Sequence, residues 1–184
     1  MITALLGSPV PPGRIAAIYA RTVPALHVND IRREETIRAA LSGVPDISRD
    51  RVPILCECSD YSGGPLLATR AREESGRILK GPTGKPIRRP WDVIPLQAVP
   101  ADRVIVPVAW RHDVPRRDVI AALLDLLEKR QITVDSGVKL RRQFEAGLSR
   151  LRARRDDRDD DHRNEDEDLA LGVALCAWYY RLIR

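Results

Sequence analysis

Short apolar runs separated by turn-forming residues open the chain. The first two, Ile2–Leu6 and Ile15–Ala20, flank a segment rich in proline and glycine, and this pattern predicts two strands joined by a turn. A third short strand is predicted over Leu26–Val28. A helix is predicted over Glu34–Leu41, and the glycine and the proline that follow mark its end.

Predicted strands and helices alternate through the middle of the chain. Val52–Cys58 is the clearest strand, and it ends in a turn of small residues that is followed by a predicted helix over Leu66–Glu74. Residues 76–100 are rich in glycine, proline, lysine and arginine, which predicts a loop or an irregular crossover. The next strand is predicted over Val104–Ala109, where Pro107 indicates the end of the strand or an edge position.

The last third of the chain is predicted to be mainly helical. The strongest helical pattern covers Pro115–Lys129, with Asp113 as the expected cap, and a short strand is predicted over Gln131–Val134. A second amphipathic helix is predicted from an apolar stripe at helical spacing: Leu140, Phe144, Leu148 and Leu151. Residues 152–166 are almost entirely charged and predict a charged connector. The closing run Leu169–Ile183 is apolar nearly all round and predicts a buried helix.

Strands that alternate with helices indicate an α/β fold, in which a mixed or parallel sheet is covered by helices. The chain has 184 residues, so we expect a single domain over residues 1–184. Aromatic residues are scarce, and the core must therefore consist mainly of leucine, isoleucine, valine and alanine.

The composition favours a soluble, intracellular protein. The formal net charge of +5 favours a nucleic-acid partner only slightly. Three cysteines, an odd number, argue against a disulfide framework, and their spacing does not suit a zinc site. No apolar run reaches the roughly 18 to 20 residues that cross a bilayer, and the N-terminus lacks the pattern of a signal peptide. We therefore expect no membrane partner.

Asp60 is the first candidate for chemistry. It follows a strand predicted to be buried and precedes the small residues Ser62, Gly63 and Gly64. Ligands of open α/β sheets usually bind at the carboxyl ends of strands, and small residues let a ligand come close. The alternative is an aspartate that forms a turn by hydrogen bonding to its own backbone, and the local sequence favours that alternative.

Four acidic residues at the start of the closing helix are the second candidate: Glu165, Asp166, Glu167 and Asp168. The helix dipole favours acidic side chains at this position, so the run has a purely structural explanation. One or two of the carboxylates could also bind a divalent metal, because Mg²⁺ prefers oxygen ligands and two-metal nucleases use clustered aspartate and glutamate.

Other motifs carry less weight. Residues 80–85 read KGPTGK, but they lack the spacing and the following helix of a phosphate-binding P-loop. The basic side chains in and after this segment could still contact a phosphate backbone: Lys80, Lys85, Arg88 and Arg89. No serine lies in a Gly-x-Ser-x-Gly elbow, which argues against a serine hydrolase.

Three stretches follow one another from about Val52 onward. A strand leads into the sequence DYSGG at residues 60–64; residues 114–134 begin with VPRR and continue as a predicted long helix and short strand; residues 167–178 read EDLALGVALCAW. Together they resemble the C-terminal nuclease domain of the phage terminase large subunit. That family has a strand ending in Asp, a spacer, Thr and Gly, then a long helix with a basic start. Its closing helix carries two aspartates before a run of leucine and alanine.

The resemblance implies an RNase H-like domain with a central mixed β-sheet flanked by α-helices. It also implies metal-dependent cleavage of double-stranded DNA during viral genome packaging, with two Mg²⁺ or Mn²⁺ ions. Carried over by motif, the catalytic and metal-binding residues would be Asp60, Glu167 and Asp168. The implied partners are double-stranded DNA and an ATPase domain or other terminase and portal components. The implied location is the cytoplasm of a bacterial host, with a phage or prophage origin.

The chain departs from this family in several places. Residues 1–29 contain no Asp or Glu, whereas the family has an aspartate in its first strand, so we expect a degenerate or truncated first hairpin and weaker metal binding. The acidic pair on the closing helix is Glu-Asp, and no Walker motif occurs in the chain. A catalytically inactive RNase H-like module that binds DNA or protein in a packaging apparatus is therefore the alternative function. An unrelated α/β domain is a third possibility.

Overall fold

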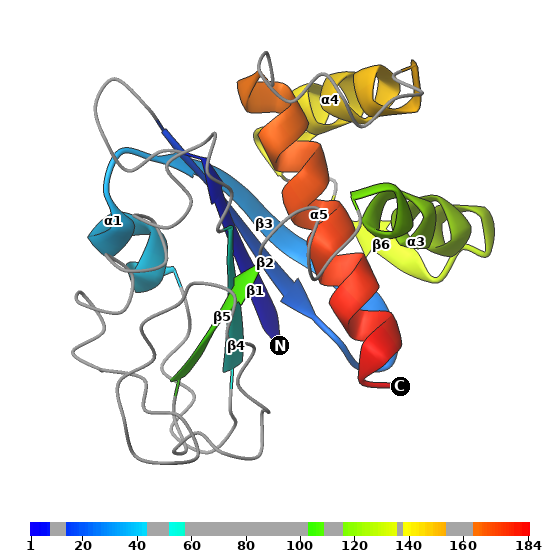
Figure 1. Ribbon diagram of the computed structural model, residues 1–184, viewed down its shortest axis with the longest axis horizontal. Coiled ribbons are helices and arrows are strands. Elements are labelled where there is room, and N and C mark those ends of the chain that lie inside the picture. Colours follow the sequence, from blue (N-terminus) through cyan, green and yellow to red (C-terminus); the bar gives the residue numbers. More distant parts are fainter. Residues whose placement is uncertain (8–13, 44–51, 58–102, 109–115, 136–137, 154–163) are drawn as a thin grey trace.

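The computed structural model describes seven stretches of the chain (Figure 1). They are residues 1–7, 14–43, 52–57, 103–108, 116–135, 138–153 and 164–184. Several sequence predictions lie outside these residues. They are the helix over 66–74, the loop over 76–100, and the expected cap and first residue of the helix that begins near residue 115.

Six strands in the described residues form one mixed sheet, in the order β5-β4-β1-β2-β3-β6. Their bounds are β1 Ile2–Gly7, β2 Ile15–Arg21, β3 Leu26–Glu34, β4 Val52–Glu57, β5 Arg103–Val108 and β6 Ile132–Val134. The first three strands are antiparallel neighbours, whereas β4 runs parallel to β1, β5 parallel to β4, and β6 parallel to β3. Because β1 and β4 are parallel, their carboxyl ends meet at the same edge of the sheet.

The described helices cover both faces of this sheet (Figure 1). Their bounds are α1 Ile37–Ser42, α3 Arg116–Glu128, α4 Arg141–Ala153 and α5 Glu165–Leu182. Helix α5 packs on β1 and β2, and both α3 and α4 pack against α5. Helix α1 contacts β2 and β3 from the opposite face. Since α5 lies between the sheet and two other helices, it is buried nearly all round, as its sequence predicts.

The two faces of β2 show why the sheet is covered on both sides. Ile18 packs against Gly172 of α5, where the absence of a side chain lets the helix come close to the strand. The next residue, Tyr19, points to the other face, and its hydroxyl donates a hydrogen bond of 2.6 Å to the carbonyl oxygen of Ala40 in α1. Neighbouring residues of one strand therefore anchor helices on opposite faces.

The α/β class, the mixed sheet and the predicted strands of the described residues are confirmed. Pro107 lies in β5, which is an edge strand of the sheet. The boundary between β3 and α1 was predicted wrongly. Glu34 ends β3 rather than beginning a helix, because β3 continues to pair with β2 as far as Glu34 opposite Ile15. Helix α1 starts at Ile37, and the preceding Thr36 accepts a hydrogen bond from the backbone N–H of Ala39.

The segment predicted as a charged connector is partly helical. Arg152 and Ala153 belong to α4, whereas Glu165 and Asp166 belong to α5. The end of α4 and the start of α5 could not be predicted from the sequence, because exposed helical positions and solvated connectors have the same charged composition. No helix among the described residues is long and apolar enough to cross a bilayer.

Candidate functional site

Gly7 is the residue around which the candidate site is built. It ends β1 with a φ of +103°, a conformation that side chains other than glycine rarely adopt. A Cβ atom at this position would overlap with the carbonyl oxygen of Arg14. Only a residue without a side chain fits at this end of β1, and the backbone N–H of Gly7 is left accessible to the neighbouring strand β4.

Glu57, the last residue of β4, contacts Gly7 from the neighbouring strand. Its side chain is completely buried, and its Oε2 accepts a hydrogen bond of 3.0 Å from the backbone N–H of Gly7. A buried carboxylate is costly unless hydrogen bonds stabilise it. The Gly7 contact therefore fixes the Glu57 carboxylate at the carboxyl edge of the sheet. The sequence analysis missed this residue, although one charged residue in an otherwise apolar strand is a usable signal.

Asp168 approaches the same residue from α5. Its Oδ2 lies 3.5 Å from the position that a Cβ atom of Gly7 would take. Gly172, one helical turn further along, contacts Leu6 and Ile18, so this face of α5 lies against β1 and β2. The fold thus brings two carboxylates, Glu57 from β4 and Asp168 from α5, to the end of β1.

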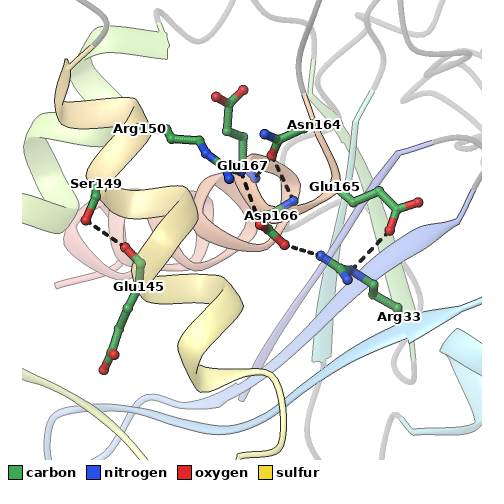
Figure 2. Close-up of polar contacts among 8 residues, drawn as sticks. All are labelled: Arg33, Glu145, Ser149, Arg150, Asn164, Glu165, Asp166 and Glu167. Carbon is green, nitrogen blue, oxygen red and sulfur yellow. Dashed lines mark hydrogen bonds and ion pairs between the residues drawn. The ribbon is translucent and has the colours of Figure 1, made fainter.

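The first turn of α5 is firmly capped (Figure 2). The side-chain oxygen of Asn164 accepts hydrogen bonds from the backbone N–H groups of Asp166 and Glu167, both 3.0 Å long. These bonds satisfy donors that have no partner inside the helix. An asparagine three residues before a glutamate is a known start signal for helices, and the sequence analysis did not use it.

Glu165 and Asp166 in this turn form ion pairs with arginines. Asp166 accepts a hydrogen bond of 2.5 Å from Arg33 of β3 and one of 3.1 Å from Arg150 of α4. Arg33 also lies 3.5 Å from Glu165. Figure 2 shows these contacts joining a strand and two helices. Glu165 and Asp166 therefore have the structural role that the sequence left open for the acidic run.

Glu167 and Asp168 occupy different surroundings from this ion-pair network. Glu167 is completely buried, and its side chain points away from Arg33 (Figure 2). Asp168 is half-buried beside Gly7. The structure therefore buries Glu167 fully and Asp168 partly, and it places Asp168 beside the end of β1.

The predicted set of three ligands is only partly described. Asp60 lies outside the described residues. Within the stretches that the structure does describe, no three His, Cys, Asp or Glu side chains form a group that could hold a metal ion. The described residues thus supply two carboxylates at Gly7, and a complete metal site would need a further ligand.

No protein-family model, curated protein or solved structure matches this chain.

Proposed function

We propose that the chain is a terminase-like nuclease domain that cleaves double-stranded DNA with Mg²⁺ or Mn²⁺. Five strands of the sheet follow the order β3-β2-β1-β4-β5, antiparallel over the first three and parallel over the last three, and β6 extends the sheet beside β3. The five-strand order supports an RNase H-like sheet. The long buried helix α5 across β1 and β2 is in keeping with the closing helix of that family.

The observation that carries the proposal is the meeting of two carboxylates at Gly7. The resembled family has an aspartate in its first strand, and this chain has none between residues 1 and 29. Glu57 reaches the end of that strand from β4, and Asp168 reaches it from α5. Glu57 would therefore replace the missing carboxylate of the first strand. Asp60 would complete the set, and Glu167 would lie beside Asp168.

The chain's own residues would orient this site. The backbone N–H of Gly7 holds the Glu57 carboxylate in place, while Asn164 fixes the first turn of α5 and hence Asp168. Glu57 and Asp168 would help to hold a divalent ion, and such an ion would supply Lewis acidity for the hydrolysis of a phosphodiester. The protein interior solvates negative charge poorly. A bound cation would offset the charge of the carboxylates where they are buried.

A second function is supported by a different observation. Residues 1–29 lack any acidic side chain, and the described residues contain no group of three metal ligands. An RNase H-like module without catalysis, which binds DNA or protein in a packaging apparatus, would have these properties. Cleavage activity separates the two functions.

The test is a supercoiled-plasmid cleavage assay with the purified chain in Mn²⁺. We expect the parent to nick the plasmid, Asp168→Asn to lose activity by roughly 100-fold or more, and Glu57→Gln by about tenfold or more, because each removes a charged ligand. Asp118→Asn, an exposed position on α3, is the matched control and should cleave like the parent. If the parent does not cleave the plasmid although circular dichroism verifies its fold, the result would favour the inactive module.

A further inference from the structure

The exposed side of α4 carries a concentration of positive charge. Between Lys139 and Ala153 the chain has five cationic side chains and one acidic one, Glu145. The cationic side chains are all exposed: Lys139, Arg141, Arg142, Arg150 and Arg152. The helix buries its other side against α5, where its apolar stripe packs. The positive charge therefore lies on the solvent-exposed side of this segment.

Three of these cations have no acidic partner among the residues that the structure describes. Arg141 pairs with Glu145 at 3.0 Å, and Arg150 pairs with Asp166 at 3.1 Å. Lys139, Arg142 and Arg152 make no ion pair with any described residue. We call these three residues, Lys139 just before α4 and the two arginines within it, the α4 basic face. Unpaired cations at this density repel one another and favour a polyanionic partner.

The spacing of the face suits a phosphate backbone. Arg142 and Arg152 are ten residues apart in one helix, which corresponds to about 15 Å. Phosphates along one strand of B-form DNA rise about 3.4 Å per step along the helix axis while the strand winds round it. Two side chains this far apart can therefore contact different phosphates of one duplex.

The helix that carries Arg142 and Arg152 also packs against the first turn of α5. Gly147 of α4 is so close to the first turn of α5 that a Cβ atom there would overlap with the carbonyl oxygen of Asp166. Arg150 connects the same two helices through Asp166. Figure 1 shows α4 crossing beside the start of α5. A strand lying on the α4 basic face would therefore run close to the turn that carries Asp168.

We propose that the α4 basic face binds the phosphate backbone of double-stranded DNA and guides it to the carboxylates at Gly7. This inference rests on the proposed nuclease function, since it assigns the surface by which that activity would hold its substrate. The contact is with phosphates, so it positions DNA without reading its sequence.

The experiment measures binding of a labelled duplex by fluorescence anisotropy in EDTA, over a range of salt concentrations. The test variant combines Lys139→Gln, Arg142→Gln and Arg152→Gln. The control variant combines Arg21→Gln, Arg130→Gln and Arg184→Gln, which removes the same charge from exposed positions. These positions lie near the end of the sheet that is opposite to Gly7. Arg21 pairs with His27 there, Arg130 precedes β6, and Arg184 contacts Pro24.

We expect the test variant to bind about tenfold more weakly, with the slope of log affinity against log salt reduced in magnitude by two to three, at about 0.9 per lost phosphate contact. The affinity and the salt slope of the control variant should stay much closer to those of the parent. Equal losses in both variants, no loss in the test variant, or no DNA binding by the parent would each overturn the proposal. So would displacement of the duplex by poly-L-glutamate at equal charge, which would assign the face to an acidic protein.

Binding in EDTA needs no cleavage, so this result is independent of the plasmid assay. A parent that binds through the face but fails to cleave would refute the nuclease and leave the DNA-binding surface standing. A parent that cleaves while the test variant binds normally would refute the surface alone.

Discussion

Neighbouring acidic residues at the start of α5 differ in their surroundings, which suit one to a structural role and another to a chemical role. Asp166 is held between two arginines, whereas Asp168 lies beside the backbone of Gly7. The sequence shows only four consecutive acidic residues. Their roles diverge because a helix turns by about 100° per residue, which points neighbours at different parts of the fold.

Arg33 should contribute measurably to stability. It is only 18% exposed and pairs with both Asp166 and Glu165, so Arg33→Gln leaves part-buried acidic charge with fewer donors. We expect a loss of about 1–3 kcal/mol in the free energy of unfolding, measured by urea denaturation. Arg32→Gln is the control, since that neighbour is 45% exposed and pairs locally with Asp30. A control loss of about 0.5 kcal/mol or less is expected, and equal losses in the two variants would contradict the account.

Residues that act through distant partners were the hardest to predict. Gly7 and Glu57 are separated by 50 positions, and Arg33 and Asp166 by 133. Local patterns carry no information about such pairs. The sequence did identify Glu167 and Asp168 as candidates because acidic residues open an apolar helix, but it missed Glu57, which lies within an apolar strand.

Pairs of elements meet closely where glycine allows it. Helix α4 crosses the first turn of α5 at Gly147, and α5 crosses β1 and β2 at Gly172. These crossings set the position of the turn that carries Asp168. Periodicity predicted most of the described elements, since their apolar faces repeat regularly. It placed the start of α1 wrongly, because the polar residues of β3 resemble a helix start.

Gly147→Ala provides a test with a definite sign. In an open helix, alanine in place of glycine would stabilise the protein by about 1 kcal/mol. Here the new methyl group would overlap with the carbonyl oxygen of Asp166, so we expect destabilisation of about 1–3 kcal/mol from overpacking. Thermal or urea denaturation measures the change. A gain in stability would show that α4 does not lie this close to α5.

The contact between β2 and α1 should respond to alkaline pH. Burial raises the pKa of Tyr19 to about 12, above the ordinary value near 10. The folded protein thus holds this proton more tightly than the unfolded chain does. The stabilisation is complete below about pH 10 and is lost as the pH rises towards 12.

Tyr19→Phe removes this titration while it keeps most of the buried ring. We therefore expect the parent to lose stability more steeply than Tyr19→Phe between pH 10 and pH 12, as judged from urea midpoints. The other groups that titrate in this range are common to both proteins and cancel in the comparison. Parallel curves would show that the Tyr19 hydroxyl is not buried against Ala40.

The whole molecule brings the carboxyl ends of β1 and β4 and the start of α5 to one edge of the sheet. Alternating strands and helices were enough to predict the α/β class. The strand order and the six-stranded sheet depend on long-range pairing, which no local pattern encodes. The same pairing brings Glu57 and Asp168 together, and α4, which carries most of the α4 basic face, packs against the first turn of α5. Substrate binding and metal binding are thus proposed for adjoining parts of one edge.

Binding of Mn²⁺ tests most directly whether a divalent-metal site lies at the end of β1. The electron paramagnetic resonance signal of the free ion measures this binding. The account predicts that the parent chain lowers this signal in a saturable way, that Asp168→Asn binds at least about tenfold more weakly, and that the exposed control Asp118→Asn binds like the parent. Identical titrations for all three proteins, or no binding by the parent, would contradict a divalent-metal site at the end of β1.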